Sequence, residues 1–278
     1  AMLMPFTNQL EKLACLTVRD SKEKEKDELL DERLLVTPPV AIQRSKDVEK
    51  QMAAEAGQAL YAAFDLIRDG YSDAVGKTVR EGEARGDMYE DKLGTYLVKI
   101  SGCNLSDHDS LEVSKLLQII GDLERLSDHA VNIAESMEEM HDKELHFSET
   151  AKKELETICN AEREIIRLTV SALAEDNMTN AALVEPLEQV VDALGAAMKT
   201  NHIKRLQEKR CTIETGFIYS DLITNCERVA DHCSNIAVSM LRIDDDSLNA
   251  HEYLAEVKSR GNELFETKYR EYAKKYHV

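Results

Sequence analysis

Apolar side chains recur three and four positions apart along most of the chain from Val40 onward. This spacing is typical of amphipathic helices, because residues i, i+3, i+4 and i+7 share one helix face. The pattern predicts six or seven helices, at about residues 40–83, 86–100, 106–141, 148–177, 185–209, 215–243 and 247–276.

Residues that favour helix ends agree with this division. Pro38 and Pro39 stop any helix before them and suit the first turn of the next one. Ser106 and Asp109 have the spacing of a capping box. Ser148 is expected to cap the fourth helix, because its hydroxyl can accept a hydrogen bond from a free amide of the first turn.

The first part of the chain has a different character. Residues 2–18 are amphipathic, and residues 20–31 form a charged run that we expect to be a solvated linker. No apolar run approaches the roughly 20 residues that a membrane-spanning helix needs, and no signal peptide is recognisable. We therefore expect a cytoplasmic protein.

A long internal repeat decides the architecture. Residues 121–137 match residues 224–240 at nine of seventeen positions, with an offset of 103 residues. The shared residues include charged and polar ones, which chance does not easily produce. A period near 100 residues is too long for a solenoid, and it fits a duplicated unit of three helices.

We therefore predict an all-α fold of two tandem three-helix bundles related by a pseudo-twofold repeat, followed by an extra C-terminal helix. The predicted division is an N-terminal linker over residues 1–38, a first bundle over 39–143, a second bundle over 144–246 and the C-terminal helix over 247–278.

The kernel of the repeat is E-R-x-x-D-H-x-x-N-I-A, with acidic pairs Glu124/Asp128 and Glu227/Asp231. Residues four apart lie one above the other on a helix, and like charges there cost a few tenths of a kcal/mol. Repetition of this cost at equivalent places suggests that a bound cation offsets it. The alternative is a solvated acidic face.

On a helical wheel, Asp128 and Asn132 lie within about 80° of Glu124, and the apolar stripe of the same helix lies roughly 180–280° away. The carboxylates are therefore expected nearly opposite the core. Carboxylate oxygens are the ligands of hard cations. Further ligands are expected from neighbouring helices, with these candidates: Glu90, Asp91, Asp192, His202 and Glu208.

The histidines and arginines of the kernel have two possible roles each, and the cysteines have one. His129 and His232 fall at the border of the core, where a hydrogen bond across the bundle is one role and metal ligation the other. Arg125 and Arg228 flank the acids and would form ion pairs or contact phosphate. Cys226 lies on the apolar stripe of the second copy and is expected in the core, as is Cys233.

Composition narrows the function. The formal net charge of −18 disfavours nucleic acid and anionic lipid as partners. Hydrophobic residues make up 43% of the chain, enough for a sizeable core. Six cysteines without C-x-x-C spacing indicate reduced thiols.

Motifs of common enzymes are missing from the sequence. It contains neither G-x-x-x-x-G-K nor G-x-G-x-x-G, and no arrangement of Ser/His/Asp or Cys/His can be argued. The di-iron motif E-x-x-H occurs once, at Glu138–His141, and a ferritin-like bundle needs two. A metal-dependent enzyme therefore stays the weaker hypothesis, and we expect no catalysis.

The two E-x-x-x-D motifs and their D-H-x-x-N-I-A continuation resemble the PhoU family, as do residues 184–188 and 201–207. The resemblance covers about residues 47–243. It implies two three-helix bundles, metal clusters at the motif acids and negative regulation of phosphate uptake. Iron is the first metal it implies, with manganese, magnesium or zinc as alternatives.

Residues 3–13 and 30–42 resemble the segment that joins the membrane helices to a PhoU-like domain in bacterial Na⁺/phosphate cotransporters. This resemblance implies a cytoplasmic regulatory domain tethered to the inner face of the plasma membrane, with the transporter as its partner. The alternatives are a free-standing PhoU-type regulator of an ABC transporter or sensor kinase, and a helical adaptor that binds no metal. No nucleic-acid partner is expected, and an oligomer stays open.

Overall fold

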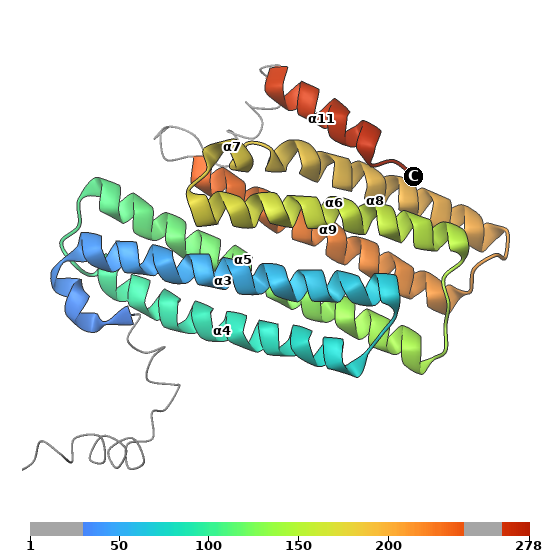
Figure 1. Cartoon of the computed structure of the whole chain (residues 1–278), viewed down its shortest axis with the longest axis horizontal. Helices are drawn as coiled ribbons and strands as arrows, with labels where there is room; N and C mark the ends of the chain where they lie inside the picture. The colour runs from blue at the N-terminus through green and yellow to red at the C-terminus, as the bar shows by residue number, and fades with distance from the viewer. Residues whose placement is uncertain (1–29, 242–262) are drawn as a thin grey trace, which may run out of the picture.

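The computed structural model describes residues 30–241 and 263–278, and these form helices and connecting turns without any strand. Figure 1 shows two layers of long helices lying side by side along the length of the molecule. The all-α class and the two bundles predicted from the sequence are confirmed. None of the described helices is both long enough and apolar enough to cross a bilayer.

The first bundle consists of three long helices that pack on one another, preceded by a short 3-10 helix. Their bounds are η3 Glu32–Val36, α3 Pro38–Asp69, α4 Asp73–Ser101 and α5 Asp107–Asp142. The second bundle repeats the arrangement with α6 Glu149–Glu175, α8 Val184–Gln207 and α9 Ile213–Leu241, and it inserts the short α7 Met178–Ala181.

The extra C-terminal helix is α11, Glu263–Lys275, which packs against α8 (Figure 1). The helix predicted over residues 247–276 is confirmed only in this part, because residues 247–262 lie outside the described residues.

The predicted caps are present. The Ser106 hydroxyl accepts a hydrogen bond from the Asp109 amide at 3.1 Å, where α5 begins. The Ser148 hydroxyl does the same for the Ala151 amide at 3.3 Å, where α6 begins. Each bond satisfies one of the amides that a helix start leaves without an intrahelical partner.

The single helix predicted over residues 40–83 is wrong. The chain reverses at residues 70–72, so that α3 ends at Asp69 and α4 begins at Asp73. Gly70 makes the reversal with φ of 93°, a conformation that side chains rarely tolerate. Apolar periodicity continues on both sides of this turn, so the pattern alone does not reveal where the helix breaks.

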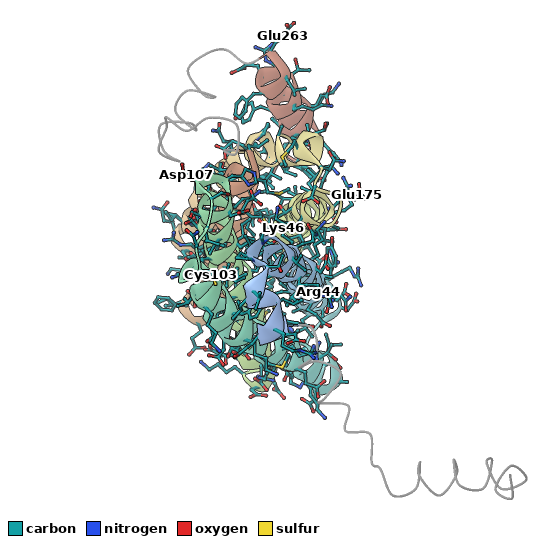
Figure 2. All side chains as sticks on the ribbon, turned by 90° about the vertical axis from the view of Figure 1, so that its left-hand side faces the viewer. Arg44, Lys46, Cys103, Asp107, Glu175 and Glu263 are labelled. Carbon is teal, nitrogen blue, oxygen red and sulfur yellow. The ribbon has the colours of Figure 1, made fainter. Side chains whose placement is uncertain are left out.

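The two bundles pack through two antiparallel helix pairs, α3 with α6 and α5 with α9. Lys50 of α3 forms an ion pair with Asp176 after α6 at 2.9 Å, and Asp65 of α3 pairs with Arg163 of α6 at 2.8 Å. Figure 2 views the end of the molecule where α3 and α5 begin and α6 ends. Buried apolar residues of both bundles form one continuous core.

The described cysteines are free, and Cys226 and Cys233 are fully buried in this core as predicted.

Candidate metal sites in the two bundles

The first candidate site lies where α4 and α5 pack together. Glu83 and Asp87 of α4 face Asp128 of α5, and one carboxylate oxygen of each lies within 4.8 Å of the others. Glu83 and Asp128 are half-buried and Asp87 is exposed. The group therefore sits at the edge of the helix packing, open to solvent on one side.

The charges of this group repel one another. Burial, Asp87 and Asp128 together raise the pKa of Glu83 above its ordinary value. Burial raises the pKa of Glu124 as well, and the nearby charges of Asp128, Asp87 and Glu90 add to the effect. Within residues 30–241 and 263–278, no hydrogen bond or ion pair to a basic side chain relieves Glu83, Asp87, Glu124 or Asp128.

The second candidate site lies at the corresponding place between α8 and α9. Glu188 and Asp192 of α8 approach Asp231 of α9, again with one oxygen of each within 4.8 Å of the others. Glu188 is buried, Asp231 half-buried and Asp192 exposed.

The two sites obey the internal repeat. Glu188 and Asp192 follow Glu83 and Asp87 by 105 residues, while Asp231 follows Asp128 by 103 residues. Each bundle therefore presents two E-x-x-x-D pairs on facing helices. The helix before each kernel carries its own E-x-x-x-D pair. A search of the sequence for this second pair would have found Glu83, Asp87 and Glu188.

The other predicted ligands are distributed as follows. Asp192 joins the second group, and Glu124 and Glu227 lie one helical turn before the aspartates that do. Glu90 lies near enough to Glu124 to raise its pKa. The remaining three predicted ligands are also outside both carboxylate groups: Asp91, which is exposed, Glu208, which pairs with Arg210, and His202, which lies beside Tyr219.

The helical wheel placed the motif acids nearly opposite the core, but the structure covers them in part. Glu124 and Asp128 are half-buried because α4 packs against that flank of α5. In a three-helix bundle each helix contacts two neighbours, so the covered face is wider than the apolar stripe. The stripe itself is buried as predicted, from Leu116 to Met137.

The two sites differ in the basic side chains that contact their acids. In the second bundle, the Lys199 ammonium contacts both oxygens of Glu227, at 2.8 and 2.6 Å. The Glu227 side chain lies against Gly195, where an added Cβ would collide with its carboxylate. Arg228 also contacts Asp231, at 3.3 Å. The residue that precedes Lys199 by 105 positions is Gly94, so the first bundle has no such ammonium.

The kernel histidines join the bundles. His129 Nδ1 donates to Asn225 Oδ1 and His232 Nδ1 donates to Asp122 Oδ1, both at 2.9 Å, and the two rings stack with centroids 5.5 Å apart. Asn225 follows Asp122 by 103 residues, so the two bonds are equivalent across the pseudo-twofold. The expected hydrogen bond exists, and it crosses from one bundle to the other.

The donor set suits a hard cation. Each group supplies three carboxylates and no thiolate or imidazole, which matches the ligands of Mg²⁺, Mn²⁺, Ca²⁺ or oxidised iron. The open side of each group leaves room for water or a further ligand. A cation here would remove the mutual repulsion and connect the two helices that carry the acids.

Comparison with known proteins agrees with the duplication of the three-helix bundle. The PhoU domain family model matches residues 50–137 and 155–240, one copy for each bundle. A curated relative from Thermotoga maritima, the "Phosphate-specific transport system accessory protein PhoU homolog 1", is 24% identical over 144 residues. That alignment covers 52% of this chain and 61% of the relative.

Solved structures share the fold. The phosphate transport system regulatory protein PhoU from Streptococcus pneumoniae superposes with a TM-score of 0.67 at 14% identity, covering 77% of this chain and 99% of the other. PhoU from Pseudomonas aeruginosa gives a TM-score of 0.62 at 17% identity, with 77% and 98% covered.

Proposed function

The chain belongs to the PhoU domain family, and we propose on that basis that it regulates phosphate uptake and does not catalyse a reaction. The names of its relatives support this role, because they describe accessory and regulatory proteins of phosphate transport systems.

The observation that carries the proposal is the repeated pair of carboxylate groups. Both copies of the domain bring two acids of one helix against an aspartate of the next. We propose that these groups hold metal ions, with Glu124 and Glu227 as additional ligands. Iron is the first choice by family resemblance, and manganese, magnesium and zinc are the alternatives.

The regulatory input would act through helix packing. A cation between α4 and α5 attracts acids that otherwise repel one another, so metal loading stabilises one arrangement of these helices over others. A partner that prefers the loaded arrangement would then respond to the metal state of the domain.

We propose a membrane transporter of phosphate as that partner, and a cytoplasmic location at the inner face of the plasma membrane. The sequence of residues 3–13 and 30–42 favours a Na⁺/phosphate cotransporter whose regulatory domain is this chain. The alternative is a free-standing regulator of an ABC transporter or a sensor kinase. A membrane-spanning region encoded directly upstream in the same reading frame would favour the first, and a stop codon there would favour the second.

The test is phosphate uptake by cells of the source organism in phosphate-rich medium. We expect uptake to rise when the domain is deleted and to return to normal with the parent sequence. Glu83→Gln/Asp87→Asn/Asp128→Asn should fail to restore regulation. A control with equal charge change on exposed acids, Glu81→Gln/Glu139→Gln/Glu266→Gln, should restore it. Uptake that is the same with and without the domain would contradict the proposal.

A further inference from the structure

A small cavity lies at the end of the second bundle, far from the acidic groups. It has a volume of about 280 Å³ and is formed where the loop before α6, the end of α8 and the start of α9 meet. Asp231 is twelve residues further along α9 than Tyr219 of the cavity wall, about 18 Å at the rise of a helix. No acidic residue lines the cavity, although the whole chain carries a net charge of −18.

Arg205 contributes a buried guanidinium to the wall. The residue is 5% exposed, and its Nη1 pairs with Glu154 Oε2 at 2.7 Å. The guanidinium lies over the ring of Tyr219, 5.0 Å from the ring centre. Its Nη2 is buried and has no hydrogen-bond partner in the described part of the chain. Glu154 balances the charge of the guanidinium, but a buried N–H without an acceptor is still costly, so Nη2 favours an additional acceptor in the cavity.

His202 adds a second buried nitrogen, Nδ1, which donates a hydrogen bond in one of the two neutral tautomers of the ring. The side chain is 8% exposed, and Nδ1 is buried without a hydrogen-bond partner among the described residues. Both unpartnered groups line one cavity. A buried arginine N–H without an acceptor, next to an imidazole nitrogen that is able to donate, points to a ligand that accepts hydrogen bonds.

The helix ends around the cavity favour an anion. Ser148 and Thr212 line the cavity and cap α6 and α9. Each hydroxyl accepts a hydrogen bond from the backbone amide three residues later, at 3.3 Å for Ser148 and 3.1 Å for Thr212. The starts of two long helices therefore meet here, with amides and positive dipole ends. The opposing carbonyls at the end of α8 are already used, because the Glu208, Lys209 and Arg210 amides bond to them.

Exposed basic residues surround the opening. Lys209 and Arg210 follow α8 and are exposed, and His146 lies on the other side in the loop before α6. Arg210 pairs with Glu208 outside the wall. Lys209 and Arg210 supply positive charge at the opening, which attracts a diffusing anion.

The first bundle does not repeat this cavity. The repeat offsets that relate the acidic sites place Ile100 at the position of Arg205 and Leu116 at the position of Tyr219. Both are fully buried apolar residues. The same bundle fold therefore forms without a buried arginine at this position. This argues against a purely structural role for Arg205.

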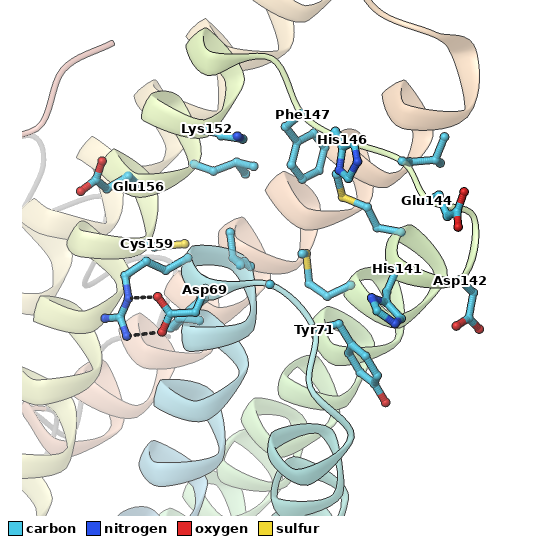
Figure 3. Close-up of a pocket in the computed structure, with 18 of the residues that line it drawn as sticks. Asp69, Tyr71, His141, Asp142, Glu144, His146, Phe147, Lys152, Glu156 and Cys159 are labelled. Carbon is cyan, nitrogen blue, oxygen red and sulfur yellow. Dashed lines mark hydrogen bonds and ion pairs between the residues drawn. The ribbon is translucent and has the colours of Figure 1, made fainter.

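A larger neighbouring cavity, of about 1100 Å³, does not share this chemistry. Figure 3 shows it between the end of α3, the end of α5 and the start of α6. Asp69, Asp142, Glu144 and Glu156 line it together with basic residues. Arg68 is already paired there with Asp69, at 2.9 and 2.7 Å. Its mixed charge selects no class of ion.

We infer that the smaller cavity binds a small oxyanion of the phosphate class, held by Arg205, His202 and the starts of α6 and α9. Several oxygens on one centre can accept from donors that converge from different elements, which a planar carboxylate does less well. The volume is at the lower limit of sites for drug-sized ligands, and it suits a phosphate ion or phosphoryl group. The inference does not depend on metal binding.

The experiment is a calorimetric titration of inorganic phosphate into the whole chain. The protein is first stripped of metal and dialysed into chelator-free buffer, so that phosphate cannot bind through a metal ion. We expect saturable binding with one ion per chain, and no saturable binding of acetate. Glycerol phosphate is titrated in parallel, and binding of this ester alone would identify a phosphoryl group on a larger molecule as the ligand.

Two variants locate the site. Arg205→Lys keeps the charge beside Glu154 but loses the planar second nitrogen, and it should weaken binding by about tenfold or more. Lys209→Gln/Arg210→Gln changes only exposed residues and should weaken it about two- to tenfold. Lys77→Gln/Arg270→Gln changes equally exposed basic residues elsewhere and should have no effect.

The rim variant keeps the test valid if Arg205→Lys does not fold, as checked by circular dichroism. The inference is overturned if the folded parent binds neither phosphate nor glycerol phosphate at millimolar concentration. It is equally overturned if the rim variant binds as tightly as the parent and the control.

Discussion

The residues of the repeated kernel divide their work between the bundle surface and the contact between bundles. Asp128 and Asp231 face acids on the neighbouring helix. His129 and His232, each next in the sequence, instead bond to residues of the other bundle. One short motif therefore explains both the candidate metal sites and the way the two copies are joined.

The histidine contact predicts a pH dependence of stability. Burial, with His232 beside it, lowers the pKa of His129. Below about pH 6.5 the unfolded chain takes up a proton that the folded chain resists, so this residue reduces stability as the pH falls. Urea unfolding at pH 7.5 and 5.5 should show a smaller loss for His129→Gln than for the parent.

The matched control for that measurement is His108→Gln, an exposed histidine at the start of the same helix. It should leave the difference between the two pH values unchanged. Equal pH dependence of His129→Gln and the parent would contradict the role given to the histidine contact.

The acidic groups predict a pH dependence of stability with the opposite sign to that of His129. The raised pKa values of Glu83 and Glu124 mean that the metal-free folded chain holds protons that the unfolded chain releases. Their cost to stability therefore grows as the pH rises above about 4.5. At pH 7.5, Glu83→Gln should stabilise the metal-free protein by about 0.2–0.5 kcal/mol for each like-charge contact removed.

Chemical denaturation of the metal-free protein checks this gain, with the exposed Glu81→Gln, two residues earlier on the same helix, as the control. If Glu83→Gln destabilises the chain at neutral pH while the control does not, the carboxylate has a structural partner that this account lacks.

At the scale of the elements, the sequence predicted helices well and one turn badly. Caps with side-chain hydroxyls mark the starts of α5 and α6, so both boundaries follow from residue types. The reversal at Gly70 carries no proline and interrupts no apolar pattern. The turn combines the positive φ of Gly70 with an extended Ser72 before α4, and a glycine in a sequence does not reveal its φ.

The candidate sites show the same limit. Asp128 and Asp231 were found because their motif is repeated in a long identical segment. Their partners on α4 and α8 lie in stretches with little identity, so the pairing depends on which helix faces align. Glu90 and Asp91 were chosen because they lie on the neighbouring predicted helix, whereas the fold brings Glu83 and Asp87 to the group.

Two glycines provide a test of the turn. A Cβ at Gly70 or at Gly121 would meet no atom within 4 Å, but only Gly70 has a positive φ. Gly70→Ala should destabilise the chain by about 1–2 kcal/mol because of its backbone conformation. Gly121→Ala, in the middle of α5, should stabilise it by about 0.5–1 kcal/mol. Thermal or urea unfolding measures both, and equal effects would contradict the assigned turn.

At the scale of the whole molecule, the two bundles depend on each other. We propose residues 39–143 and 144–246 as the two units of the duplication, and their apolar residues form one shared core. The chain should therefore unfold in a single transition by both far-ultraviolet circular dichroism and tyrosine fluorescence. Two separated transitions would show that each bundle is stable without the other.

The duplication is not symmetric in chemistry. The second bundle has Lys199 on its motif glutamate and a buried arginine at its end, while the first bundle has neither. Within the described residues, Glu83, Asp87, Glu124 and Asp128 form no hydrogen bond or ion pair with a basic side chain, and only the charge of Arg125 acts on Glu124 from nearby. We therefore expect the first site to hold metal more tightly than the second.

Elemental analysis of the untagged protein is the most direct test of the central claim, that the repeated carboxylate groups are metal sites. The parent is loaded separately with iron, manganese, magnesium and zinc and then desalted, beside the variants Glu83→Gln/Asp87→Asn/Asp128→Asn and Glu81→Gln/Glu139→Gln/Glu266→Gln. The account predicts stoichiometric metal in the parent and in the surface variant Glu81→Gln/Glu139→Gln/Glu266→Gln. It predicts a clear loss of metal in Glu83→Gln/Asp87→Asn/Asp128→Asn. Equal and sub-stoichiometric metal in all three folded proteins would contradict it, and the repeated acids would then be a docking face for the partner.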